Sequence, residues 1–234
     1  MLGIACALYD EAFELIKPLS RQKINAFYHY TGKICNIPVS VFLTKPGLRK
    51  NKGNFIKWVR ENQITTLLQT GYCGSLTSRY RPGDVCHINK VSGMDMEKIF
   101  QFSGMGDSHH LLTVDRPILT VEAREDLQYQ FSNADLMDME AWHICQLLDE
   151  EFPQIKIVIL KIIGDVPGED SLMKQEVKMR SFFREHSIKK RIKIVLDTGL
   201  PFFELYYRKR KLQKILNKAI HNYILIHFKE SAVE

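Results

Sequence analysis

Hydrophobic and polar residues form two strand-like patterns along the chain. Short apolar runs, rich in β-branched and aromatic residues, fit strands that are buried in a sheet. These runs occupy residues 2–8, 65–70, 84–91, 111–114, 136–139 and 155–163. Residues 27–32 and 37–44 alternate as half-buried strands do, and the segment Ile34–Pro38 between them predicts a hairpin turn.

Between the strands, apolar residues recur at helical spacing. Residues 10–18, 53–62, 121–131 and 140–150 fit amphipathic helices, and Thr120 is placed to cap the third. Because strands and helices alternate, the sequence predicts an α/β fold, with a mixed or parallel sheet and helices on both of its faces.

Residues 92–110 break this pattern and predict a long loop, of the kind that often carries function. His109 and His110 close this segment. We expect both at the surface, with an acid/base or substrate-contacting role as the alternative.

The composition fits one globular domain over residues 1–234, since 45% of the residues are hydrophobic and 26% are charged. The five cysteines show neither a disulfide pattern nor metal-ligand spacing, so we expect free thiols, no metal and a reducing, cytoplasmic location. The apolar N-terminus lacks a basic flank and fits a strand better than a signal peptide. No apolar run approaches the ~20 residues that span a bilayer.

The net charge of +6 is concentrated late in the chain, at residues 189–191 and 208–211. We expect a basic, helical C-terminal part from about residue 171. A solvated helix face explains the charge most simply, and a nucleic-acid surface is the less favoured alternative. The aromatic residues beside it favour a core or subunit contact. They are Phe202, Phe203, Tyr206 and Tyr207.

Polar or glycine-rich segments follow four of the expected strands. They are Asp10-Glu11, Gly71–Gly74, Met139-Glu140 and Gly164-Asp165. Ligand sites in open α/β sheets form at the carboxyl ends of strands. If these four ends converge, they make one site.

In this order, the four segments resemble the purine nucleoside phosphorylase/uridine phosphorylase superfamily, and most of all its methylthioadenosine/S-adenosylhomocysteine nucleosidases. Residues 3–11 are similar to the family's G-I-I-G-A-M-x-x-E, and residues 70–76 to T-G-S-A-G-G-L followed by V-G-D-I/V at residues 82–85. Residues 137–141 resemble V-E/D-M-E-A, and residues 161–166 resemble R-x-I-S-D-x-A-D. The resemblance spans roughly residues 1–166. It implies a three-layer phosphorylase-type fold, no cofactor, and a homo-oligomer, with a dimer favoured.

Cleavage of a nucleoside at C1′ needs a proton for the leaving base, support for a ribosyl cation and an aimed nucleophile. The resemblance assigns the first task to Asp165, as general acid at purine N7. It assigns the ribose hydroxyls to Glu140, with Met139 packed on the sugar. It assigns activation of water to Glu11, and Asp10 takes that place if the register shifts by one.

Departures from the family's motifs bear on the nucleophile and the base. Gln69 stands where the phosphorylases carry an arginine, Tyr72 replaces a serine or threonine, and the G-D-P-x-R phosphate loop is missing. All three favour water over phosphate. Pro117 and Ile118 stand where the nucleosidases stack an aromatic ring on adenine, and Gly164 replaces a serine beside the catalytic aspartate. The expected base and sugar pocket consists of Tyr72, Cys73, Gly74, Pro117 and Ile118.

The sequence therefore predicts a nucleosidase acting on a purine-type nucleoside. A phosphorylase with an atypical phosphate site at Arg49 or Arg116 is the alternative, with Arg49 as a possible anion contact. A catalytically degenerate member that only binds a nucleoside is a third possibility. We expect no membrane partner, and nucleic acid is the least favoured partner.

Overall fold

The computed structural model of the chain describes residues 1–24, 27–45, 48, 51–102, 108–168 and 200–228. Its strands are β1 (Leu2–Cys6), β2 (Ser20–Ile24), β3 (Phe27–Ile34), β4 (Ile37–Leu43), β5 (Thr66–Ser75), β6 (Val85–His87), β7 (Lys90–Gly93), β8 (Ile99–Gln101), β9 (His110–Thr113), β10 (Leu136–Asp138) and β11 (Lys156–Asp165). Its helices are α1 (Tyr9–Ile16), α2 (Lys52–Glu61), α3 (Val121–Gln130), α4 (Ala141–Glu151) and α7 (Leu200–Phe228).

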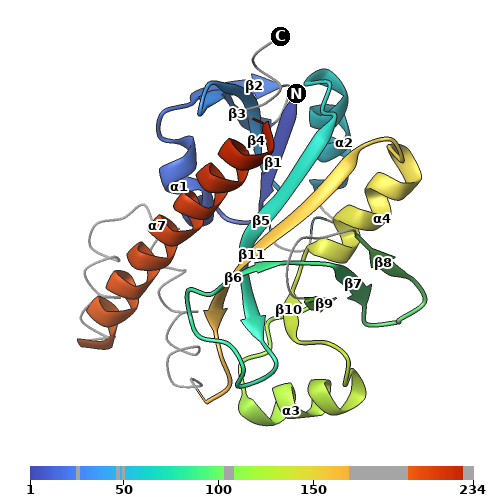
Figure 1. The fold of residues 1–234 in the computed structure, drawn as a ribbon, viewed down its shortest axis with the longest axis vertical. Helices are drawn as coiled ribbons and strands as arrows, with labels where there is room; N and C mark the ends of the chain where they lie inside the picture. The colour runs from blue at the N-terminus through green and yellow to red at the C-terminus, as the bar shows by residue number, and fades with distance from the viewer. Residues whose placement is uncertain (25–26, 46–47, 49–50, 103–107, 169–199, 229–234) are drawn as a thin grey trace.

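The strands form one mixed sheet in the order β2-β3-β4-β1-β5-β10-β9-β7-β8, and β11 pairs with β5 and β6. Strand β1 runs parallel to β4 and β5, and β11 runs parallel to β5 over almost its whole length. Strand β10 runs antiparallel to β5 but parallel to β9. Figure 1 shows β5 and β11 side by side through the middle of the molecule.

Helices cover both faces of the sheet. Helices α1 and α7 lie against one face, and α2 and α4 lie against the other (Figure 1). On the first face, Ala12 and Leu216 pack with Ile4 and Leu68 of the sheet. On the second face, Trp58 and Leu148 belong to a separate buried cluster. The expected three-layer α/β fold with a mixed central sheet is confirmed.

Local sequence chemistry accounts for most of these elements. Strand β1 is buried at every position, as its unbroken apolar run predicts. The β3–β4 turn places Cys35 and Asn36 at positive φ, a region that asparagine tolerates better than most residues. Thr120 caps α3 as expected, because its hydroxyl accepts a hydrogen bond from the Ala123 N–H at 3.2 Å.

Several expected boundaries were wrong. Strand β5 continues to Ser75, through the glycine-rich segment expected to follow it. The run 84–91 is two strands, β6 and β7, and the expected long loop contains β8. Strand β2 was missed, because its sequence Ser-Arg-Gln-Lys-Ile has no apolar alternation.

The expectation of two surface histidines was also wrong. His109 and His110 are both buried. The Tyr80 hydroxyl and His109 Nδ1 lie 2.9 Å apart, and the Ser92 hydroxyl and His110 Nε2 also lie 2.9 Å apart. Each ring therefore has a buried hydrogen-bond partner, as interior polar groups require.

The basic run 208–211 is not simply a solvated helix face. Arg208 donates to the Gly164 carbonyl at 2.8 Å, and Lys209 is buried and paired with Asp10. Arg210 contacts Glu14 at 3.4 Å. These cations tie α7 to α1 and to the end of β11. The other basic run, 189–191, lies outside the described residues, as do the side chains of Phe202 and Phe203.

Tyr207 is exposed, whereas Leu205, Leu212 and Leu216 form the buried stripe of α7. Of the two aromatic residues described there, Tyr206 is therefore half-buried and Tyr207 lies outside the core, so the expected core contact is wrong for Tyr207. Within the described ranges, no helix combines the length and apolar character needed to cross a membrane.

Candidate active site

The site develops around a short opening in the sheet beside β5. One edge of β5 is paired with β11 from Thr66 to Gly74. The other edge is paired with β1 up to Thr70 and with β10 from Gly74 onward. Neither β1 nor β10 therefore pairs with residues 71–73 on this edge, so backbone groups there are available to side chains. We call residues 71–73 the β5 window.

Glu11 reaches the β5 window from the first turn of α1. Its Oε1 accepts a hydrogen bond from the Tyr72 N–H at 3.2 Å. Its Oε2 accepts from the N–H groups of Ala7 and Leu8, at 3.0 and 2.9 Å. The carboxyl group is therefore fixed at the end of β1, against β5. Asp10, the alternative in a shifted register, instead pairs with Lys209 of α7.

Burial raises the pKa of the Glu11 carboxyl above its usual value, and the nearby charge of Asp10 raises it further. The N–H groups of Leu8 and Tyr72 and the charge of Lys161 act in the opposite direction but do not cancel the effect. A carboxyl group held in this way keeps a proton to higher pH than an exposed glutamate does.

Two glycines of β5 make room for carboxylates. A Cβ on Gly71, whose φ is +140°, would lie 2.9 Å from Glu11 Oε2. A Cβ on Gly74 would lie 3.0 Å from Asp165 Oδ2 and 2.7 Å from Met137 Cε. Only glycine allows both acids to approach the strand this closely.

Strand β10 delivers a buried acidic segment to the same region. The Asp138 carboxylate accepts hydrogen bonds from the Thr113 hydroxyl at 2.8 Å and from the Ala141 N–H at 3.1 Å. These bonds fix the start of α4, where Glu140 is the buried N-terminal flanking residue. Half-buried Met139 packs against the apolar cluster that contains Met137.

Lys161 of β11 links these acids. Its ammonium lies 2.8 Å from Asp138 Oδ2, and both side chains are almost fully buried. Burial alone lowers the pKa of Lys161, but the charge of Asp138, followed by those of Glu140 and Glu11, raises it above its usual value. The lysine is therefore a permanent cation, close enough to Glu11 and Glu140 for their charges to act on it.

Asp165 is placed beside Gly74 by an irregularity in strand pairing. The register of β11 on β5 shifts between Ile163 and Asp165, so that Asp165 is paired with Gly74. The Asp165 carboxylate forms an ion pair with Arg124 of α3, whose side chain is only 1% exposed. The Arg124 guanidinium also donates to the Ser75 carbonyl at 2.8 Å.

The residues expected to line the base and sugar pocket do not all lie together. Tyr72 and Gly74 lie in or beside the β5 window. Ile118 is half-buried against the same apolar cluster as Met139, while Pro117 is exposed. The Cys73 side chain is buried in the core with Tyr80 and Cys86, so only its backbone can face a ligand.

The two candidate anion contacts are Arg49 and Arg116. Arg49 lies outside the described residues, and Arg116 is exposed in the segment before α3. Gln69 is buried, and its Oε1 has no hydrogen-bond partner among the described residues. Among all the residues that the structure describes, no group of three or more His, Cys, Asp or Glu side chains is arranged to hold a metal ion.

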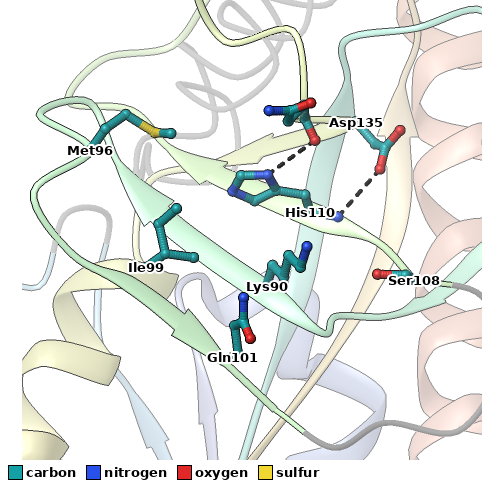
Figure 2. Close-up of a pocket in the computed structure, with 8 residues that line it drawn as sticks. Lys90, Met96, Ile99, Gln101, Ser108, His110 and Asp135 are labelled. Atoms are coloured by element: carbon teal, nitrogen blue, oxygen red, sulfur yellow. Dashed lines mark hydrogen bonds between the residues drawn. The ribbon is translucent and has the colours of Figure 1, made fainter.

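A separate pocket of about 350 Å³ opens at the other end of β9 (Figure 2). It is lined by Lys90, Met96, Ile99, Gln101, Ser108, His110, Asn133 and Asp135. Of the residues singled out in the sequence, His110 alone lines it, and a substrate-contacting role for that residue was the less favoured alternative. His110 begins β9 and Thr113, which binds Asp138, ends it, so roughly 10 Å of strand separates the pocket from the acidic cluster. Figure 2 shows His110 hydrogen-bonded there to Asp135 and Asn133 rather than to the acids of the site.

Sequence reasoning missed three charged residues of the site: Arg124, Asp138 and Lys161. A signal existed for Lys161, since it is a lone cation inside the apolar run of β11. Asp138 stood inside a quoted motif but was given no task. Arg124 gave no such signal, because a lone arginine among the acids of α3 is typical of an exposed helix face, and only the tertiary fold shows that it is buried.

No family model matches the sequence, and no curated protein matches it. Solved structures match the fold over most of the chain. The methylthioadenosine/S-adenosylhomocysteine nucleosidase of Helicobacter pylori aligns with a TM-score of 0.66 and 15% identity, covering 94% of this chain and 97% of that one. The Streptococcus pneumoniae nucleosidase, solved with a transition-state inhibitor, gives a TM-score of 0.65 and 14% identity over 94% and 99% of the two chains.

The Neisseria meningitidis nucleosidase, in complex with methylthio-immucillin-A, gives a TM-score of 0.63 and 15% identity over 88% of this chain and 98% of that one. At this level of identity the likeness concerns the fold. The chain therefore has the fold of these nucleosidases, as its motifs indicated.

Proposed function

We propose that this chain, which shares the fold of the methylthioadenosine/S-adenosylhomocysteine nucleosidases, hydrolyses the N-glycosidic bond of a purine-type nucleoside of that kind. The observation that carries the proposal is the gathering of Glu11, Glu140 and Asp165 around β5, each from the end of a different strand. Convergent acids beside an unpaired strand edge are the expected setting for glycosidic chemistry.

In the proposed reaction the C1′–N bond breaks and leaves positive charge on the ribosyl group. Asp165, in its acid form, gives a proton to a ring nitrogen of the leaving base. The oxygen of a water molecule bonds to C1′, and Glu11 accepts the proton that the water loses. Glu140 accepts hydrogen bonds from the ribose hydroxyls, so its negative charge faces the sugar as the cation develops.

Water fits this site better than phosphate does. A phosphate dianion needs guanidinium or several N–H and O–H donors. At the position of the phosphorylases' arginine, this chain has Gln69, whose buried amide is neutral. A neutral amide cannot balance the charge of a phosphate dianion as a guanidinium does.

Nucleoside binding without turnover is the second candidate function. The ion pair between Asp165 and Arg124 favours it, because a guanidinium stabilises the carboxylate, whereas a general acid must carry a proton. In this alternative Asp165 only accepts a hydrogen bond from the base.

A direct assay separates these functions. The protein is incubated with methylthioadenosine, S-adenosylhomocysteine, adenosine, inosine and uridine, with and without phosphate, and free base and sugar are separated by chromatography. Asp165→Asn tests the acid, and Asp149→Asn, which removes an exposed surface carboxylate, is the matched control.

The hydrolase function is supported if the unaltered protein and Asp149→Asn release free base without phosphate while Asp165→Asn does not. Strict dependence on phosphate, with ribose 1-phosphate as product, contradicts it. Nucleoside-induced thermal stabilisation with no product supports the binding function instead.

A further inference from the structure

Arg124 carries a positive charge and pairs with Asp165, the carboxyl group proposed to donate a proton. Its side chain is 1% exposed, whereas that of Asp165 is 24% exposed. One guanidinium nitrogen is fixed by the Ser75 carbonyl, and another pairs with Asp165 Oδ2. The cation thus approaches Asp165 from the protein interior, while the acid itself lies at the edge of the site.

This arrangement constrains the protonation state of Asp165. A guanidinium keeps its charge at any pH at which a protein is folded, so it cannot adapt to burial by losing a proton. A buried cation is tolerated only when it is paired. Protonation of Asp165 would weaken that pair, so the resting site favours the carboxylate.

Among the described residues, neighbouring cations act in the same direction, and the nearby acid Asp138 is balanced by one of them. On β5, the Cys73 thiol is neutral, because burial raises its pKa well above the usual value and Asp165 is among the charges that raise it further. On α7, Arg208 donates to the Gly164 carbonyl next to Asp165 and adds a second positive charge. On β11 itself, Lys161 is a cation paired with Asp138.

We propose that Arg124 is a positioning residue that holds Asp165 beside Gly74 in its ionised form, and thereby limits the fraction of the protein in which Asp165 can protonate a base near neutral pH. This inference rests on the proposed function. In each turnover Asp165 takes a proton from solvent, loosens its pair with Arg124, and passes that proton to the base as the C1′–N bond breaks. Because its acid form becomes scarcer as pH rises, cleavage near neutral pH is slower than an unpaired aspartic acid would allow.

The protonation of Asp165 can be measured without any substrate. Protein labelled with carbon-13 at the aspartate carboxyl groups is titrated by NMR, and the resonance missing from Asp165→Asn identifies the residue. The expected midpoint in the unaltered protein lies below the ordinary aspartate value of about 3.9. In Arg124→Gln it rises by about 1–3 pH units, and in Arg124→Lys, which keeps the charge, it rises less.

The pH profile of base release is then recorded for the same three proteins. Glu11, the proposed base, has a raised pKa, so the position of the alkaline limb follows Glu11, while the population of protonated Asp165 scales the rate above it. The rate of base release near pH 7 should therefore rise in Arg124→Gln, in step with the NMR midpoint. A purely structural role for Arg124 would lower the rate at every pH.

A midpoint at or above the ordinary value in the unaltered protein overturns the inference, even if Arg124→Gln does not fold. An NMR shift with no rise in the rate of base release near pH 7 overturns its catalytic part. If no nucleoside is cleaved at all, the proposed function fails, while the titration still decides whether Arg124 holds Asp165 ionised.

Discussion

Asp138 and Lys161 form an ion pair of 2.8 Å with both side chains almost fully shielded from solvent. Asp138 also accepts the Thr113 hydroxyl and the Ala141 N–H, so the pair joins β9, β11 and α4. Removing one partner leaves the other charge buried and uncompensated.

Lys161→Met should therefore lower the free energy of unfolding by about 3–5 kcal/mol, measured by urea denaturation. The double variant Asp138→Asn/Lys161→Met should lose less than Lys161→Met alone, because no unpaired charge is left. If the double variant loses as much stability as Lys161→Met or more, an unpaired buried charge is not the source of the loss.

Gly74→Ala tests the close approach of Asp165 to β5. The added Cβ would meet Met137 Cε at 2.7 Å and Asp165 Oδ2 at 3.0 Å, so we expect a loss of about 1–3 kcal/mol in stability and a lower rate of base release. Gly53→Ala is the matched control, because nothing lies within 4 Å of its added Cβ. Its stability should be unchanged or slightly increased, since alanine is the better helix former. Equal losses in both variants would exclude a specific role for the space at Gly74.

Glu11 should make stability fall as pH rises through the acidic range. Burial, aided by Asp10, raises its pKa in the folded state, so the folded protein binds the proton more tightly than the unfolded chain does. This contribution is fully present below the unfolded value of about 4.3 and is lost between that value and the higher folded pKa. The free energies of unfolding of the unaltered protein and of Glu11→Gln are measured by urea denaturation across this pH range. As pH rises, the unaltered protein should lose stability relative to Glu11→Gln. A constant difference would mean that the pKa of Glu11 is not raised.

His110 should act in the opposite direction. Burial lowers its pKa, and the opposing effect of the Asn133 carbonyl does not cancel this. The unfolded chain therefore binds a proton first, and stability is lost as pH falls from about 6.5 toward the lower folded pKa. Denaturation midpoints at pH 8 and pH 5 should differ more in the unaltered protein than in His110→Gln. His87, whose pKa burial also lowers, is present in both proteins and cancels in the comparison.

Elements with strong local patterns could be predicted from the sequence. The β-branched run of β11, the apolar run of β1 and the capping residue Thr120 each carry their structural reason within a few neighbouring residues. The three acids Glu11, Glu140 and Asp165 were found through short motifs at the ends of such elements. Their catalytic roles remain predictions.

Long-range features could not be predicted in the same way. Strand β5 continues through Gly71 because β11 pairs with it along the whole of that stretch, which its own sequence does not reveal. Arg124 and Asp165 are 41 residues apart, and the sequence around Arg124 does not show that this arginine is buried. The same holds for Lys209 and Asp10, which meet only because α7 returns to pack on α1.

The β5 window also bears on how such a site can diversify. Its extent is set by where β1 and β10 stop pairing with β5, not by any loop that borders it. Residues in the surrounding loops can therefore change to suit another base or sugar while the opening itself is preserved. Lengthening β1 by a single pair of residues would instead close part of it, so the length of β1 determines the size of the opening.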